Sequence, residues 1–178
     1  MKVTYSDLKN KRVFISGGGS GIGATIVEYF CEQKSEVYFI DIDLKSSNKL
    51  IKKIKKKGFR VPKFIECNIL DVKKLQNIIK DIISKKGAIH CLINSAANDD
   101  RHTTEQVDEK YWENRMGINL KHYFFAAQAV VKGMKKIKSG SIVNLSSVSW
   151  VLGEGDKVVY ETAKSAVVGL TRSFAQEF

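Results

Sequence analysis

The fold of this 178-residue chain can be predicted from one stretch of its sequence, Arg12-Val13-Phe14-Ile15-Ser16-Gly17-Gly18-Gly19-Ser20-Gly21-Ile22-Gly23. Its first five residues form a short apolar run typical of a buried strand, and residues 21–34 carry apolar side chains on one helical face. Glycines at 17, 21 and 23 let the chain turn sharply and let its backbone approach a pyrophosphate closely. The helix that follows would direct its first N–H groups at the phosphates. This order of strand, glycine loop and helix predicts a dinucleotide site.

Strands and helices alternate along the rest of the chain with short links. Apolar runs predict further strands at 36–41, 61–67, 90–96 and 140–147. Helical periodicity predicts helices at 47–57, 71–85 and 160–178, and one or two long helices over 107–138. Near-continuous apolar strands joined by helices are typical of a parallel sheet covered on both faces. We therefore predict one α/β domain over residues 1–178, with a Rossmann-type doubly wound parallel sheet.

The chain is basic, with a formal net charge of +11, and many of its lysines lie in the segment 49–57. No aromatic residues alternate with these lysines, so we interpret them as a solvated helix face and expect no specific nucleic-acid partner. Weak nonspecific anion binding is the alternative. No apolar run is long enough to span a bilayer and no signal region opens the chain, so we expect a cytoplasmic protein without a membrane partner. The three cysteines fit no metal-binding spacing and are expected to be small buried hydrophobes, with no metal bound.

Asp41 ends the second predicted strand, close to the distance beyond the glycines at which a carboxylate binds ribose hydroxyls. Such a carboxylate would repel a 2′-phosphate, and neither Ser20 nor Ile42 supplies a cation to attract one. These residues favour NAD over NADP. Two alternatives stay open, namely that Asp41 only caps a turn and that Asp43 is the carboxylate in question.

The remaining cofactor contacts are expected from the ends of the third and fourth strands, where small and polar residues gather. The predicted cofactor-binding residues are Gly17, Ser20, Gly21, Ile22, Gly23, Asp41, Asn68, Ile69, Asn94 and Ala96.

A set of short motifs follows along the chain: Ser16-Gly17 with Gly21-Ile22-Gly23, then Asn94-Ser95-Ala96-Ala97, Asn119, Ser147 and Tyr160-xxx-Lys164. In the order and spacing of these motifs, essentially the whole chain resembles the short-chain dehydrogenase/reductase family. The resemblance implies an oxidoreductase that transfers a hydride between an alcohol and NAD. It also implies that Asn119, Ser147, Tyr160 and Lys164 are catalytic, and that Tyr160 and Lys164 contact the cofactor as well. Ser16 and Ala97 depart from the family pattern, which has Thr and Gly at these positions.

The chemistry explains why this set contains a tyrosine and a lysine. A general base must take the hydroxyl proton as the hydride leaves, and a free tyrosine, with a pKa near 10, is too weakly acidic to do so efficiently at neutral pH. Lys164 lies one helical turn after Tyr160, so the two side chains share a face. Its ammonium would stabilise the phenolate. By resemblance, Ser147 would bind the substrate oxygen and Asn119 would support a water in a proton relay.

A narrower resemblance concerns the substrate. Residues 98–102, 111–113, 119–122 and 147–150 resemble the sugar dehydrogenases of this family, of the D-xylose type, which implies oxidation of an aldose at its anomeric carbon. Its implied substrate residues are Ser147, Trp150, Asp99 and Arg101. Trp150 could stack on a sugar ring. The alternatives are a solvated loop at 99–102 and a core or interface role for the tryptophan.

Members of the family are longer than this chain. The resemblance implies that a sixth strand, a substrate-covering loop and a seventh strand would follow residue 178. We therefore expect the fold to lack its last strands and to leave the fifth strand as an exposed edge. The same absence argues against a homo-oligomer. It also leaves open an alternative function, a truncated and catalytically inactive dinucleotide-binding remnant.

Overall fold

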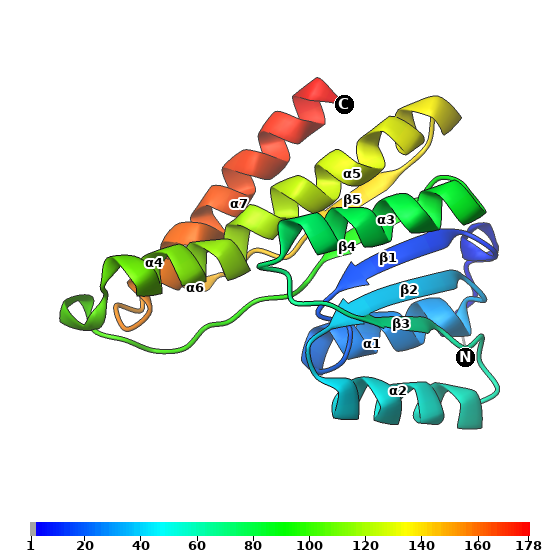
Figure 1. Ribbon diagram of the computed structural model, residues 1–178, viewed down its shortest axis with the longest axis horizontal. Helices are drawn as coiled ribbons and strands as arrows, with labels where there is room; N and C mark the ends of the chain where they lie inside the picture. Colours follow the sequence, from blue (N-terminus) through cyan, green and yellow to red (C-terminus); the bar gives the residue numbers. More distant parts are fainter. Residues whose placement is uncertain (1–2) are drawn as a thin grey trace.

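Five parallel strands form one sheet in the computed structural model, which describes residues 3–178 (Figure 1). The strands are β1 (Arg12–Ser16), β2 (Glu36–Asp41), β3 (Lys63–Glu66), β4 (Cys91–Asn94) and β5 (Ser141–Asn144). Their order across the sheet is β3-β2-β1-β4-β5. The chain adds β2 and β3 on one side of β1 and then β4 and β5 on the other side, so the strand order has a reversal between β1 and β4. Open α/β sheets bind ligands at such a reversal, beyond the carboxyl ends of the strands. The predicted Rossmann-type sheet is confirmed.

Helices cover both faces of the sheet (Figure 1). One face is covered by α1 (Gly21–Glu32) and α2 (Leu44–Lys56), and the other by α3 (Val72–Lys86), α5 (His122–Ile137) and α7 (Val158–Glu177). The shorter elements are α4 (Glu109–Met116), α6 (Ser149–Leu152), the 3-10 turns η1 (Ser6–Leu8) and η2 (Thr104–Gln106), and the π-helix η3 (Gly117–Lys121).

Alternation along the strands builds two cores. Val13 and Ile15 of β1 pack with α1 and α2, whereas Phe14, between them, packs with α3 and α5. Successive side chains of a strand point to opposite faces, so a strand buried on both sides must be apolar throughout. This requirement explains the unbroken apolar runs from which the strands were predicted.

The element boundaries differ from the predictions where capping or helix geometry intervenes. Helix α2 begins at Leu44 rather than at residue 47, because the Asp43 carboxylate accepts a hydrogen bond from the Ser46 N–H (2.9 Å) and caps the helix there. The predicted helical region 107–138 begins two residues later and is divided into α4, η3 and α5. The sequence pattern did not predict α6, and β3, β4 and β5 are each shorter than expected.

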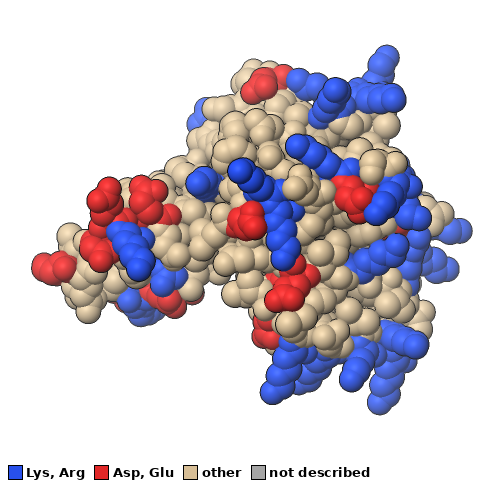
Figure 2. All heavy atoms as spheres, viewed as in Figure 1, with Lys and Arg blue, Asp and Glu red and all other residues tan. Residues whose placement is uncertain are grey.

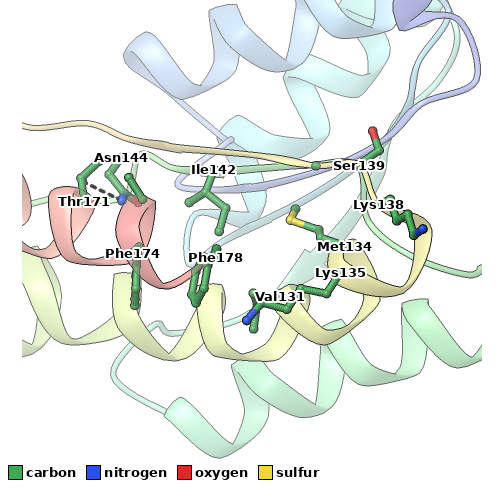
Figure 3. Close-up of a pocket in the computed structure, with 12 residues that line it drawn as sticks. Val131, Met134, Lys135, Lys138, Ser139, Ile142, Asn144, Thr171, Phe174 and Phe178 are labelled. Carbon is green, nitrogen blue, oxygen red and sulfur yellow. Dashed lines mark hydrogen bonds between the residues drawn. The ribbon is translucent and has the colours of Figure 1, made fainter.

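Strand β5 is the edge of the sheet, as expected. It pairs with β4 alone among the described residues, and Val143 is 46% exposed. Beside it, β5, α5 and α7 enclose a hollow of about 590 Å³ (Figure 3). Its walls include Met134, Ile142, Phe174 and Phe178, and an Asn144–Thr171 hydrogen bond (3.0 Å) closes one end. None of the predicted catalytic residues lines this hollow.

Charge is unevenly spread over the molecule. In the view of Figure 2, Lys and Arg gather over α2 and at the end that carries the amino termini of the strands, whereas acidic side chains gather around η2 and α4. Lys53 of α2 and Lys57, the residue that follows this helix, pair with Glu28 of α1. No helix among residues 3–178 is long and apolar enough to cross a membrane.

Candidate active site

A cleft of about 710 Å³ opens at the carboxyl ends of the strands, beside the reversal between β1 and β4. Segments far apart in the sequence meet there: the glycine loop, the ends of β2 and β3, the loop after β4, and α7. The predicted residues that line it are Gly17, Ser20, Gly21, Ile22, Gly23, Asp41, Asn68, Ile69, Ala96, Asp99, Tyr160 and Lys164. The structure therefore brings most of the predicted cofactor contacts to one place.

At Gly17 and Gly23 the glycine loop packs against backbone too closely for a side chain. A Cβ on Gly23 would collide with the carbonyl oxygen of Gly17, and a Cβ on Gly17 would lie 2.6 Å from the Cα of Ala96. Gly17 also has a φ of +70°, in the left-handed region that favours glycine. The Ser16 hydroxyl accepts hydrogen bonds from the N–H groups of Ser95 (3.2 Å) and Ala96, which joins the ends of β1 and β4. The result is a tight backbone cradle of the kind that a pyrophosphate requires.

Asp41 caps a turn and also lines the cleft, so the two roles that sequence reasoning treated as alternatives are compatible. Its carboxylate accepts hydrogen bonds from the N–H groups of Gly19 (2.8 Å) and Asp43 (2.9 Å), so it does cap the turn. It also lines the cleft, and each carboxylate oxygen has a second lone pair that a ribose hydroxyl could use. Asp43, the competing candidate, lines the cleft as well, but its carboxylate accepts from the Ser46 N–H as the cap of α2.

Lys164 is the most deeply buried charged residue of the cleft, with 1% of its surface exposed. Its ammonium donates hydrogen bonds to the Tyr123 hydroxyl (2.9 Å) and to the Leu145 carbonyl (2.8 Å). It lies 5.6 Å from the centre of the Tyr160 ring. Burial lowers the pKa of Lys164 to about 8, because the charged form loses hydration. A lysine with such a pKa is typical of a functional site.

Tyr123 contacts Lys164 from behind the cleft lining, and sequence reasoning missed it. Its ring is fully buried, and its hydroxyl donates to the Leu145 carbonyl (3.1 Å) while it accepts from Lys164. Burial raises the pKa of Tyr123, and the nearby Tyr160 raises it further. No sequence motif marks this position, which reads as one more apolar residue of a core-facing helix.

The serines after β5 are placed differently from expectation. Ser146 lines the cleft and donates to the backbone carbonyl of Lys164 (2.7 Å), whereas Ser147 does not line the cleft. The Ser147 hydroxyl instead shares a hydrogen bond with that of Ser149 (2.9 Å). A substrate role for Ser147 stays a prediction, one that requires this hydroxyl to change its partner.

The two predicted asparagines have well-defined partners. Asn119 lies buried in the π-helix, where its side chain accepts from the Asn98 N–H (2.8 Å) and donates to the Asn98 carbonyl (2.9 Å), so it fixes the loop after β4. Asn94 is also buried and does not line the cleft, because its amide donates to the side chain of Asn144 (2.8 Å) and joins β4 to β5. Its part in cofactor binding stays a prediction, and any such part would be indirect.

Only one of the substrate candidates from the 98–102 and 147–150 segments, Asp99, lines the cleft. Arg101 pairs with Asp156, and its side chain is largely exposed. Trp150 lies on α6 with 39% of its surface exposed, outside the cleft lining. The structure does not bring Arg101 or Trp150 to the cleft, because the first is held by Asp156 and the second lies on the outer surface of a short helix.

His102 is a second residue that sequence reasoning did not select. It is buried, and its Nε2 accepts a hydrogen bond from the Val159 N–H in the first turn of α7 (3.3 Å). Its Nδ1 therefore carries the proton and lies 2.9 Å from the Tyr111 hydroxyl. The histidine links the loop after β4 to the beginning of the helix that carries Tyr160.

The fold and the cleft define an α/β protein built to bind a dinucleotide beside a half-buried tyrosine and a buried lysine. The model of the short chain dehydrogenase family matches residues 11–178. The chain therefore belongs to the short-chain dehydrogenase family of oxidoreductases.

Curated relatives include two sugar dehydrogenases. The chain is 41% identical over 174 residues to a D-xylose 1-dehydrogenase of Caulobacter vibrioides, covering 97% of this chain and 68% of the relative. It is 39% identical over 171 residues to a "Probable galactose dehydrogenase" of Rhizobium meliloti, covering 96% of this chain and 67% of the relative. The chain thus spans about two thirds of the length of these relatives.

A solved structure supports the same grouping. The aldohexose dehydrogenase of Thermoplasma acidophilum superposes with a TM-score of 0.84 at 28% identity, covering 98% of this chain and 64% of that one.

Proposed function

We propose that this chain is a dehydrogenase that oxidises an aldose at its anomeric carbon with NAD as the hydride acceptor. The observation that carries the proposal is the buried ammonium of Lys164 beside the Tyr160 ring, in the same cleft as the glycine cradle. The two sugar dehydrogenases at about 40% identity support an aldose as the substrate class.

In the proposed reaction, the residues of the cleft move a proton. Bound NAD would accept the hydride that leaves the anomeric carbon. The Tyr160 phenolate takes the proton of the anomeric hydroxyl and becomes neutral, and the nearby Lys164 ammonium lowers the free energy of the phenolate that must be present before this transfer. Lys164 has three N–H donors, of which Tyr123 and Leu145 use two, so one remains for the cleft.

The preference for NAD over NADP rests on the charge of the cleft wall. Asp41 and Asp43 lie at the end of β2, where they would repel a 2′-phosphate. Among the described residues that line the cleft, the one lysine or arginine is Lys164. The Lys164 ammonium contacts the carbonyl of Leu145, the residue after β5. Strand β5 is three positions from β2 in the sheet order, or roughly 14 Å at the usual strand spacing.

The test is to follow NADH formation at 340 nm by the 178-residue chain, with a panel of aldoses and simple alcohols. We expect turnover with an aldose, and loss of nearly all of it in Tyr160→Phe with the affinity for NAD kept. Activity that persists in Tyr160→Phe would contradict the role of Tyr160. Activity with NADP equal to that with NAD would contradict the role of Asp41.

A second candidate is a dinucleotide-binding protein without turnover. It is favoured by the serine arrangement, since Ser147 does not line the cleft, and by the absence of Arg101 and Trp150 from the cleft wall. Binding of NAD measured by calorimetry, together with no turnover of any aldose or alcohol in the panel, would select this candidate.

The proposal includes a cytoplasmic location, which is supported by the three cysteines, all unpaired in the structure. Cys31 and Cys67 are buried as expected, and Cys91 is partly exposed. None of the lysines of α2 lines the cleft, which supports a small molecule rather than a nucleic acid as the partner of the site. A homo-oligomer is not part of the proposal.

A further inference from the structure

We propose that Tyr123 is a positioning residue that, together with the Leu145 carbonyl, holds the Lys164 ammonium beside Tyr160. The inference rests on the proposed function and adds to it a residue that the motifs of the sequence do not contain. It is carried by three mutually consistent hydrogen bonds: Lys164 to Tyr123 (2.9 Å), Lys164 to the Leu145 carbonyl (2.8 Å), and Tyr123 to the same carbonyl (3.1 Å).

The geometry makes Tyr123 a fixed acceptor for the ammonium. Its ring is 0% exposed in α5, and its hydroxyl hydrogen is directed to Leu145, so the oxygen lone pairs are left for Lys164. A buried ammonium is tolerated only when protein acceptors replace its lost hydration. Without the Tyr123 oxygen, the Leu145 carbonyl would be the one remaining protein acceptor among the hydrogen bonds of Lys164.

Among the described residues, no carboxylate pairs with Lys164 and could take over this task. The titratable groups that face it are Tyr123 and His122 from α5 and Tyr160 from its own helix, α7. Burial and the nearby Lys164 lower the pKa of His122 to about 3, so His122 is neutral and adds no negative charge. Lys164 forms no ion pair within residues 3–178. The charged state of Lys164 therefore depends on two neutral oxygen atoms, one from Tyr123 and the other from Leu145.

The test uses the substitution Tyr123→Phe in the full chain, which removes one oxygen atom and keeps the ring. Nζ of Lys164 is titrated by NMR in protein labelled with ¹³C,¹⁵N-lysine, and its signal is assigned by its loss in Lys164→Met. Losing a hydrogen bond to a charged group is expected to lower the pKa of Lys164 by about one unit. Tyr38→Phe is the matched control, because Tyr38 is also buried and its hydroxyl also donates (2.7 Å to Glu36), but it does not touch Lys164.

The kinetic test is the pH profile of kcat with an aldose. Above the pKa of Lys164, the kcat of Tyr123→Phe should be about tenfold lower than that of the unchanged chain, because Lys164 of the variant loses its proton at a lower pH. Below this pKa the difference in kcat should be smaller. A merely structural loss would lower kcat equally at every pH. An unchanged Lys164 pKa in Tyr123→Phe would overturn the proposal.

The role of Tyr123 can still be tested if the chain shows no turnover or if the variant does not fold. If the chain shows no turnover with any substrate, the proposed function fails, while the NMR titration still decides the role of Tyr123. If Tyr123→Phe does not fold, the ¹⁵Nζ signal of the unchanged chain decides. A doubly held, buried ammonium should exchange its protons at least tenfold more slowly than the surface lysines, and equally fast exchange would overturn the proposal.

Discussion

Two residues of the cleft meet requirements that ordinary helix residues do not. Lys164 is buried although an uncharged residue would be the more stable choice, and Gly23 has no room for a side chain where most helices would favour alanine. Strained or poorly solvated groups of this kind are expected where a site must hold a ligand or tune a pKa. Each can be tested by one substitution.

Replacing Lys164 with methionine should stabilise the protein. Its folded-state pKa of about 8 lies below the ordinary 10.5, so between these values the unfolded state binds more protons and stability rises with pH. The cost is complete below pH 8 and disappears as the pH passes 10.5. We expect Lys164→Met to raise the free energy of unfolding by about 1–3 kcal/mol at pH 7, and by less at pH 10.

Urea denaturation at the two pH values measures the effect, with the exposed Lys110→Met as the control. A variant that is less stable at pH 7 would show that the hydrogen bonds to Tyr123 and Leu145 outweigh the desolvation of the ammonium.

Gly23→Ala should damage both the cradle and the fold. The added Cβ collides with the Gly17 carbonyl, so the loop must move. We expect NAD affinity to fall more than tenfold and the free energy of unfolding to fall by about 1–3 kcal/mol. Isothermal calorimetry and urea denaturation give the two values. Gly169→Ala in α7, which meets nothing within 4 Å, should leave NAD binding unchanged, and a loss of affinity there would indicate a nonspecific effect.

At the scale of elements, the beginning of α7 determines where Tyr160 lies. Lys157, the residue before the helix, makes no side-chain cap, so the Val159 N–H is satisfied by His102 from a distant loop. The backbone N–H of His102 also donates to the Asp156 carbonyl (2.7 Å). Two bonds thus join the loop after β4 to the beginning of α7, the helix that carries Tyr160 and Lys164, and they couple the candidate substrate loop to the position of Tyr160.

His102→Ala should therefore lower kcat as well as stability. We expect a loss of about 1 kcal/mol in the free energy of unfolding, as for other lost helix caps, and at least a tenfold lower kcat because Tyr160 moves with the helix end. His102→Gln places an acceptor in reach of Val159 and should recover part of both.

Steady-state kinetics and thermal denaturation provide the comparison. Arg101→Ala, which removes only an exposed ion pair beside the same loop, should have little effect. Equal losses in the Gln and Ala variants would argue that packing, and not the cap, is what His102 contributes.

At the scale of the whole molecule, the sheet joins the two ends of the site. Asp41 ends β2 and Lys164 contacts the residue after β5, so a dinucleotide that spans the cleft would touch segments on both sides of β1. Strand β5 is held on one side only, by β4, and Val143 is exposed. Ligand binding should therefore stabilise the part of the sheet with the fewest partners.

We expect NAD at one hundred times its Kd to raise the free energy of unfolding by about 2.7 kcal/mol, with a corresponding rise in Tm. NADP at the same concentration should raise Tm less, and Asp41→Ala should narrow the difference because the repulsion of the 2′-phosphate is lost. Differential scanning fluorimetry with both nucleotides measures this. Equal shifts by NAD and NADP in the unchanged chain would contradict the proposed preference.

The parallel α/β sheet, the glycine cradle and the tyrosine–lysine pair could all be predicted from the sequence, because each depends on local order. Apolar strand runs, glycine spacing and the one-turn distance from Tyr160 to Lys164 are all readable along the chain. The cap by Asp43 was within reach of the same reasoning, since its carboxylate contacts a residue three positions away.

The contacts between side chains that lie far apart in the sequence could be seen only once the elements were packed together. Tyr123 contacts Lys164 from 41 residues away, and His102 reaches Val159 from 57. In the sequence, Tyr123 is indistinguishable from a core aromatic residue and His102 from a loop residue. Trp150 and Arg101 fell outside the cleft for the same reason, because the direction of a side chain after a strand depends on loop packing. Periodicity reports the element to which a residue belongs, whereas the partners of a buried polar group depend on how the elements pack together.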